Sequence, residues 1–196
     1  MTLEKILAKH KSKLSRKQKA LAQKLSKATR YEVAGCWINA GWQEQSLANL
    51  VFARKTPAGF ALSMFMVDLG CQGVQDVNIL MGLTPSQVEE VLAEALPEGE
   101  RVDVGVAMAI LLKALGFAAK FEFEPHPQYI VAAAFLRGLE PDARALQTVV
   151  VGDGKGKPVY YYGLMESEEE SKAVRARLEA LCGSGGYRVQ EIPNTK

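Results

Sequence analysis

The sequence has little of the chemistry that cysteine and histidine supply. Its 196 residues include three cysteines and two histidines. The cysteines, Cys36, Cys71 and Cys182, are odd in number and scattered, and neither a Cys-x-x-Cys nor a His-x-x-x-His spacing occurs. A disulfide framework and a structural zinc site are therefore not expected. Reduced thiols of a cytoplasmic protein fit this pattern, and we predict no metal and no cofactor.

Long apolar runs and an export signal are also missing. The N-terminus is charged and has no apolar stretch of the kind found in a signal peptide. The longest apolar segments, residues 102–115 and 129–136, fall short of the ~20 residues that a membrane-spanning helix needs. The sequence therefore predicts no membrane partner, and its 48% hydrophobic and 23% charged residues are typical of a globular protein.

Charge is distributed unevenly along the chain. The formal net charge is +2, but residues 1–30 contain ten lysines and arginines and a single acid, Glu4. This segment therefore carries +9 and the remainder of the chain −7. A strongly basic segment thus precedes an acidic body, a pattern that indicates attraction to polyanions.

The basic segment predicts an amphipathic helical arm over residues 1–29. Residues 2–28 lack glycine and proline, and Leu7, Leu14 and Leu21 recur every seven residues in a narrow apolar stripe. The other faces carry cations that phosphates of RNA or DNA, or an acidic protein, would attract. Two alternatives stay open: the helix docks on its own domain, or its leucines pair with a second subunit in a homo-oligomer. The candidate nucleic-acid contacts are Lys9, Lys13, Arg16, Lys17 and Lys24.

Residues 30–192 predict an α+β domain, because strand and helix patterns are segregated along the chain. The domain could divide into 30–82 and 83–192, and 193–196 form a short tail. A three-stranded antiparallel segment is expected at 31–39, 47–54 and 60–68. Central helices are expected at 84–96, 102–115 and 129–136. A C-terminal β-hairpin of 148–151 and 158–162, a helix from Ser167 to about 181, and a strand at 187–192 complete the prediction.

A cluster of unusual residues follows the third predicted strand. A turn at this point could place a thiol and two carboxylates in one pocket, although a catalytic cysteine also needs a base and an electropositive setting. In the alternative interpretation Asp68 caps backbone amides or pairs with Arg54, while Cys71 packs inward. The candidate patch comprises Arg54, Asp68, Cys71, Gly73, Asp76 and His126.

Two further motifs have simple structural interpretations. Residues 152–158 are rich in glycine and lysine, but no Ser or Thr follows the lysine and the next segment is a predicted strand rather than a helix. The segment therefore fits a hairpin tip better than a phosphate-binding loop. His126 lies between two prolines, where it suits the start of a helix better than a metal or catalytic site.

Residues 53–59 read A-R-K-T-P-A-G and residues 67–76 read V-D-L-G-C-Q-G-V-Q-D. These segments resemble an A-R-x-x-P-x-G turn and a V-D-x-x-C-x-G-V-K-D segment shared by a group of uncharacterised bacterial proteins. Residues 115–117 and 156–163 look similar to later blocks of that group, whereas Gln75 stands where lysine is usual. The resemblance implies no activity, but it points to the same candidate patch.

The sequence favours a non-enzymatic binding or accessory protein whose basic helix contacts RNA, DNA or an acidic protein. Electrostatic attraction would supply the affinity in that case. A small cytosolic enzyme with a site around Asp68, Cys71 and Asp76 is one alternative. An oligomeric structural protein is the other.

Overall fold

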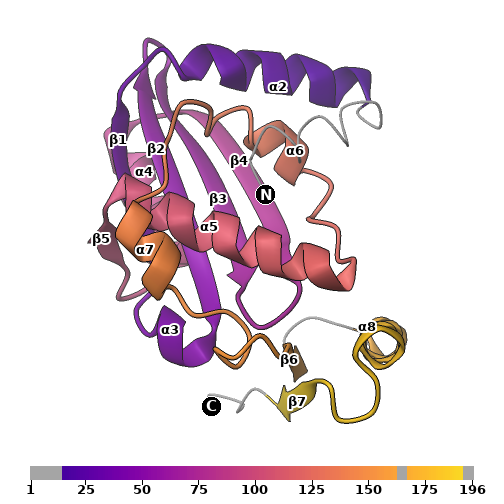
Figure 1. The fold of residues 1–196 in the computed structure, drawn as a ribbon. Coiled ribbons are helices and arrows are strands. Elements are labelled where there is room, and N and C mark those ends of the chain that lie inside the picture. The colour runs from indigo at the N-terminus through magenta and orange to yellow at the C-terminus, as the bar shows by residue number, and fades with distance from the viewer. Residues whose placement is uncertain (1–14, 163–166, 192–196) are drawn as a thin grey trace.

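The computed structural model of the chain describes residues 15–162 and 167–191. These residues form a five-stranded antiparallel sheet and a separate two-stranded sheet, with helices packed around them (Figure 1). The predicted α+β class is confirmed. Residues 1–14 of the predicted arm, among them Leu7, Lys9, Lys13 and Leu14, and the predicted tail 193–196 lie outside the described residues.

The three predicted strands form the middle of the larger sheet, whose order is β4-β3-β2-β1-β5. A hairpin turn through Pro57 and Ala58 joins β2 to β3, and every residue pair from Leu47–Asp68 to Thr56–Gly59 is in register. Apolar clusters cover both faces of the sheet, which explains why β3 has no polar face. These strands are β1 (Val33–Ile38), β2 (Leu47–Thr56) and β3 (Gly59–Asp68).

The two edge strands were not predicted. β4 (Gly73–Leu83) begins inside the glycine-containing turn, and its register with β3 shifts between Met66 and Val67, which hides the alternation near its start. β5 (Glu100–Val102) has only three residues, of which Glu100 and Arg101 are exposed, so it carries no apolar pattern.

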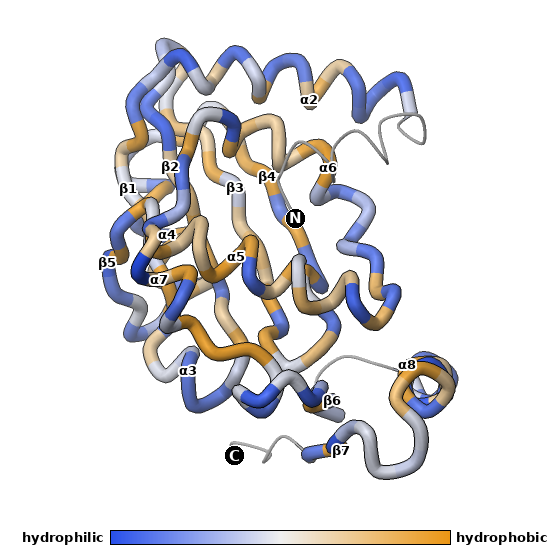
Figure 2. The backbone as a smooth tube through the Cα atoms, viewed as in Figure 1, coloured by the Kyte–Doolittle hydropathy of each residue, from blue (hydrophilic) through white to orange (hydrophobic). Residues whose placement is uncertain are grey.

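The central helix α5 (Val104–Ala118) packs across one face of the sheet, and nine of its residues are buried. The expected end at Gly116 is wrong: the helix passes through this glycine, because packing outweighs its cost of ~1 kcal/mol. With the 3-10 turn η2 (Ala119–Phe121), the segment Val104–Phe121 is apolar and long enough by composition to cross a membrane. However, 56% of it is buried inside the protein, as in the core helix of a soluble protein. In Figure 2 the tube of α5 crosses the sheet and contains many residues coloured as hydrophobic.

The second half of the basic segment forms α2 (Arg16–Ala28), which begins at a capping box between Ser15 and Gln18. Leu25 and Ala28 are fully or almost fully buried, and Leu21 packs against the same core. α2 also contacts the short helix α6 (Tyr129–Ala132). In residues 16–28 the helix therefore docks on its own domain, and its leucines are used there.

The remaining helices match the prediction in part. The capping boxes at Thr84 and Ser167 open the predicted helices α4 (Pro85–Ala95) and α8 (Glu168–Cys182). α6 is a single turn, shorter than expected, because bonds such as Phe135 N–H to Ala132 O follow a tighter i→i−3 pattern. Two short helices were not predicted, α3 (Trp42–Gln45) and α7 (Ala143–Thr148).

The predicted C-terminal hairpin is wrong. Thr148 ends α7, no strand follows it before Gly152, and β6 (Val159–Tyr162) pairs in parallel with β7 (Arg188–Glu191). The chain before β6 bonds elsewhere: Gly152 N–H donates to Leu69 O, and Val159 N–H to Gly70 O. These bonds fix the segment on the β3–β4 turn, so it is not free to fold back on β6.

Candidate functional site

The turn between β3 and β4 is organised by Asp68. Its Oδ1 accepts hydrogen bonds from the N–H groups of Gly70 and Cys71, and its Oδ2 accepts one from Gln72 N–H at 3.0 Å. The carboxylate thus caps three consecutive backbone amides of the turn, and Asp68 as a whole is only 7% exposed. This is the structural alternative that the sequence left open.

Cys71 points into an apolar cluster and is 1% exposed. The cluster also contains Phe117, Phe121, Tyr160 and Leu178. A thiol in this position is shielded from a dissolved substrate, whereas reactive cysteines are at least partly exposed. Cys71 therefore contributes to packing between the two sheets.

Gly73 is required by the same turn. It has a φ of +76°, and a Cβ at this position would lie 2.9 Å from Cβ of Ala118 in α5. Both the left-handed backbone and the close approach of α5 favour glycine. Gly73 therefore serves the fold.

Asp76 and His126 lie near the start of β4 and make local bonds. Asp76 accepts hydrogen bonds from Val77 N–H at 2.8 Å and from the Asn78 amide at 3.0 Å. The N–H of His126 donates to Val74 O at 2.9 Å, which holds the segment before α6 beside the edge of β4. The Nδ1 atom of His126 accepts a hydrogen bond from Gln128 N–H. His126 thus acts as a helix-start residue at this edge.

Arg54 lies at the other end of the sheet. It pairs across the strands with Ala61, whereas Asp68 pairs with Leu47, seven residues away along β2 or ~23 Å. An Arg54–Asp68 ion pair is therefore excluded. The candidate patch divides into a turn around Asp68 and a separate buried arginine.

The buried Arg54 guanidinium joins three segments. Its Nε donates to Phe135 O at 3.2 Å, its Nη1 donates to Tyr31 O at 2.7 Å, and it lies 5.4 Å from the ring centroid of Phe135. Burial lowers the pKa of Arg54 below its ordinary value. The side chain is a structural tie between β2, the end of α2 and the chain after α6.

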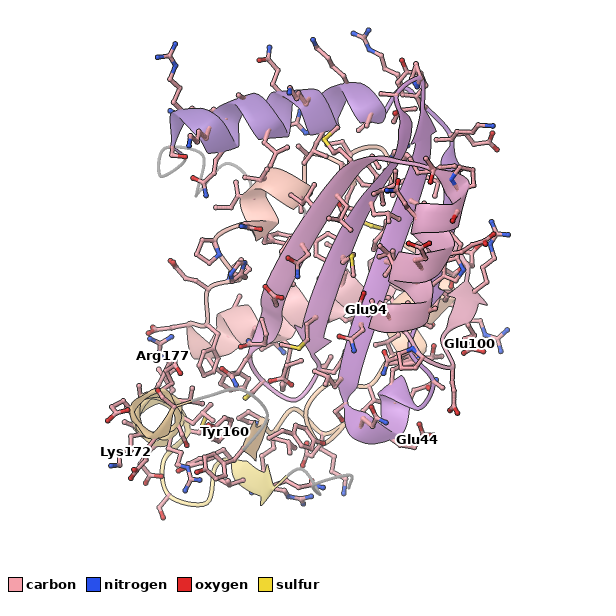
Figure 3. All side chains as sticks on the ribbon, turned by 180° about the vertical axis from the view of Figure 1, so that it is seen from behind. Glu44, Glu94, Glu100, Tyr160, Lys172 and Arg177 are labelled. Atoms are coloured by element: carbon pink, nitrogen blue, oxygen red, sulfur yellow. The ribbon has the colours of Figure 1, made fainter. Side chains whose placement is uncertain are left out.

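α2 presents a cationic surface on the side away from the core. No acid occurs in Arg16–Ala28, and in the described part of the chain no ion pair involves this helix. Figure 3 shows long side chains with nitrogen tips projecting from α2 away from the sheet. We call these exposed cations the α2 basic face: Arg16, Lys17, Lys19, Lys24, Lys27 and Arg30.

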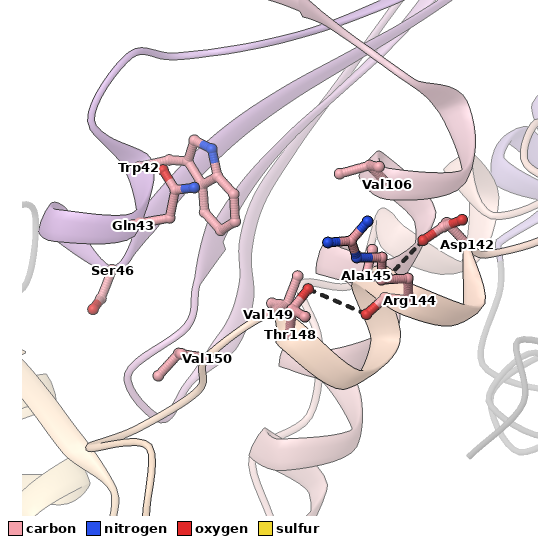
Figure 4. A pocket seen from close by; sticks show the side chains of 10 residues that line it. All are labelled: Trp42, Gln43, Ser46, Val106, Asp142, Arg144, Ala145, Thr148, Val149 and Val150. Atoms are coloured by element: carbon pink, nitrogen blue, oxygen red, sulfur yellow. Dashed lines mark hydrogen bonds between the residues drawn. The ribbon is translucent and has the colours of Figure 1, made fainter.

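A pocket of about 540 Å³ opens between α3, α7 and the start of α5. Trp42 forms one wall, and the side chain of Arg144 extends toward the space from the other (Figure 4). The pocket is lined by Trp42, Gln43, Ser46, Val106, Asp142, Arg144, Ala145, Thr148, Val149 and Val150.

Sequence reasoning missed this pocket. Asp142 is an N-cap whose Oδ1 accepts from Ala145 N–H, and this signal could have located α7. The approach of α7 to α3, about 100 residues earlier in the chain, is a tertiary arrangement that no local pattern contains.

Comparison with known proteins found no matching family model, curated protein or solved structure. The resemblance of residues 53–59 and 67–76 to a bacterial group remains a prediction.

Proposed function

We propose that this protein is a non-enzymatic polyanion-binding protein whose α2 basic face contacts the phosphates of RNA or DNA. The proposal rests on one observation: α2 docks on the core of its own domain. Burial of Leu25 and Ala28 turns the apolar side of the helix inward, so its five cations, and Arg30 just beyond its end, lie on the solvent side. Four more, Lys5, Lys9, Lys11 and Lys13, precede them in the sequence.

Docking also favours binding energetically. A helix held on a folded domain presents its charges without first having to become ordered, so less conformational entropy is lost when a polyanion binds. The positions of the cations support one continuous contact: Lys17 and Lys24 are about two turns apart on one flank, and Lys27 lies about three turns from Arg16.

Such contacts are independent of base sequence, because phosphates carry no sequence information directly. The α2 basic face has no aromatic residues between its cations on which bases would stack. We therefore expect similar affinities for unrelated sequences of the same length and strandedness.

The test is electrophoretic mobility with mixed cellular RNA and with duplex DNA at low salt. Deletion of α2 is unsuitable, because it would expose the core that Leu25 and Ala28 cover. The informative variant is the triple substitution K19Q/K24Q/K27Q, which leaves the buried side of α2 intact. The matched control is K120Q/K155Q/K172Q, which removes the same charge from exposed lysines elsewhere.

We expect the α2 variant to lose at least tenfold in affinity and the control to lose much less. Equal losses would mean that net charge, not the α2 basic face, determines binding. Absence of binding by the wild-type protein at low salt would overturn the proposal.

A further inference from the structure

The pocket between α3 and α7 has one flat apolar wall. Trp42 is 9% exposed, and in Figure 4 its indole ring faces the space between the two helices. Val149, also buried, and Val106 add aliphatic surface beside it. A flat ring that enters this space would pack against the indole, which favours aromatic ligands.

The opposite side supplies one cation that the protein does not use. Arg144 is exposed. Within residues 15–162 and 167–191 its guanidinium makes no hydrogen bond or ion pair. The hydrogen bond that the Thr148 hydroxyl donates to Arg144 goes to its backbone carbonyl. Figure 4 shows the guanidinium extending from α7 toward Trp42. Its planar fork of donors suits a carboxylate bound through two parallel hydrogen bonds.

The charge of the pocket selects between anions. Arg144 is the one basic residue in the lining, and the carboxylate of Asp142 is the one acid. Asp142 Oδ1 already accepts a hydrogen bond from Ala145 N–H at 2.6 Å, which holds its carboxylate at the first turn of α7. Arg144 and Asp142 together sum to zero, so a monoanion takes the site to −1 and a dianionic phosphate takes it to −2, and the dianion meets the greater repulsion. Gln43 offers a neutral polar group at the rim.

We propose that this pocket binds a small aromatic monocarboxylate, with the carboxylate on Arg144 and the ring against Trp42 and Val149. Its volume of about 540 Å³ lies within the range of sites that hold small ligands. The site is separate from the α2 basic face, and neither proposal depends on the other.

The test is titration with phenylacetate, followed by calorimetry on the wild-type protein and by tryptophan fluorescence. The chain has two tryptophans, so a W37F variant leaves Trp42 as the single tryptophan. The comparison ligands are phenylacetamide, which lacks the charge, and phenyl phosphate. The key variants are R144Q and R144K, and R137Q is the control because Arg137 is also exposed but does not line the pocket.

We expect saturable binding of phenylacetate that quenches or shifts Trp42 fluorescence, with R144Q weakening it about ten- to a hundredfold. R144K, which keeps the charge but loses the fork, should fall between R144Q and wild type, and R137Q should bind as wild type does. The proposal is overturned if phenylacetate does not bind, if R144Q binds equally well, or if the neutral amide or the phosphate binds as tightly.

Discussion

At the scale of single residues, burial separates the three thiols. Cys36 and Cys71 are each 1% exposed, whereas Cys182 is half-buried at the end of α8. A thiol reagent must reach sulfur and meet a thiolate, so accessible cysteines react first. The residue that the sequence nominated as a nucleophile, Cys71, is thus one of the two that the fold protects.

We therefore expect an aromatic disulfide reagent to modify one thiol per native molecule near neutral pH. The modified residue should be Cys182, identified by peptide mapping, and all three should react after unfolding in guanidinium. Fast modification of Cys71 in the native protein would contradict its packed position and revive a catalytic role for it.

Cys36 makes the stability sensitive to alkaline pH. Desolvation, with a smaller contribution from Asp103, raises the pKa of Cys36 from its ordinary 9.0 to about 12. Between these values the unfolded chain is ionised and the folded one is not, so stability is fully present below pH 9 and is lost as pH rises.

Urea unfolding gives the free energy of unfolding of the wild type and of C36A. Between pH 7.5 and 10 the difference between these two free energies should shift by about 1.4 kcal/mol in favour of C36A. The constant cost of removing the side chain cancels in this comparison. An unchanged difference would mean that the Cys36 thiol ionises normally in the folded protein.

Arg54 shows how a buried cation can be structural. R54K should destabilise the protein by about 2 kcal/mol, because lysine cannot reach the Tyr31 and Phe135 carbonyls from one planar group. R101K is the control: Arg101 also contacts a ring, that of Trp37, and the Ala34 carbonyl, but it is exposed and should change stability by at most ~0.5 kcal/mol. Thermal unfolding of both variants measures the difference, and equal effects would refute the structural role.

At the scale of elements, α2 is part of the domain. Neighbouring substitutions on this helix should therefore destabilise the protein to very different extents. L25A removes a fully buried side chain and should cost about 2–5 kcal/mol, whereas K24A on the exposed flank should cost ~0.5 kcal/mol or less. Denaturant unfolding compares the two, and a neutral L25A would mean that α2 is an independent arm in solution.

Elements with strong local chemistry were predicted well. The capping boxes at Thr84 and Ser167 and the Pro57–Gly59 turn each fix backbone hydrogen bonds within a few residues, so their patterns are sufficient. β5, α3 and α7 are too short to carry a period, and their positions depend on partners distant in sequence. The false hairpin at 148–162 had acceptable turn chemistry but formed different long-range bonds.

At the scale of the whole molecule, both candidate sites depend on tertiary structure. The sequence identified the cations of the α2 basic face, but not which side of the helix faces solvent, because that follows from the core that receives Leu25. The α3–α7 pocket was not predictable from the sequence, because Trp42 and Arg144 come to line the same pocket only once the sheet and α5 have folded. The candidate patch around Asp68 is divided for the same reason: Arg54 lies on the same pair of strands as Asp68 but at the opposite end.

The most direct test of the account is the salt dependence of nucleic-acid binding. Counterion release predicts that log Kobs falls steeply with log salt, and that each lost phosphate contact reduces the slope by about 0.9 on duplex DNA. The K19Q/K24Q/K27Q variant should therefore show a slope shallower by two to three than wild type, and K120Q/K155Q/K172Q an unchanged slope. A wild-type slope near zero, or identical slopes for the two variants, would contradict a nucleic-acid contact through α2.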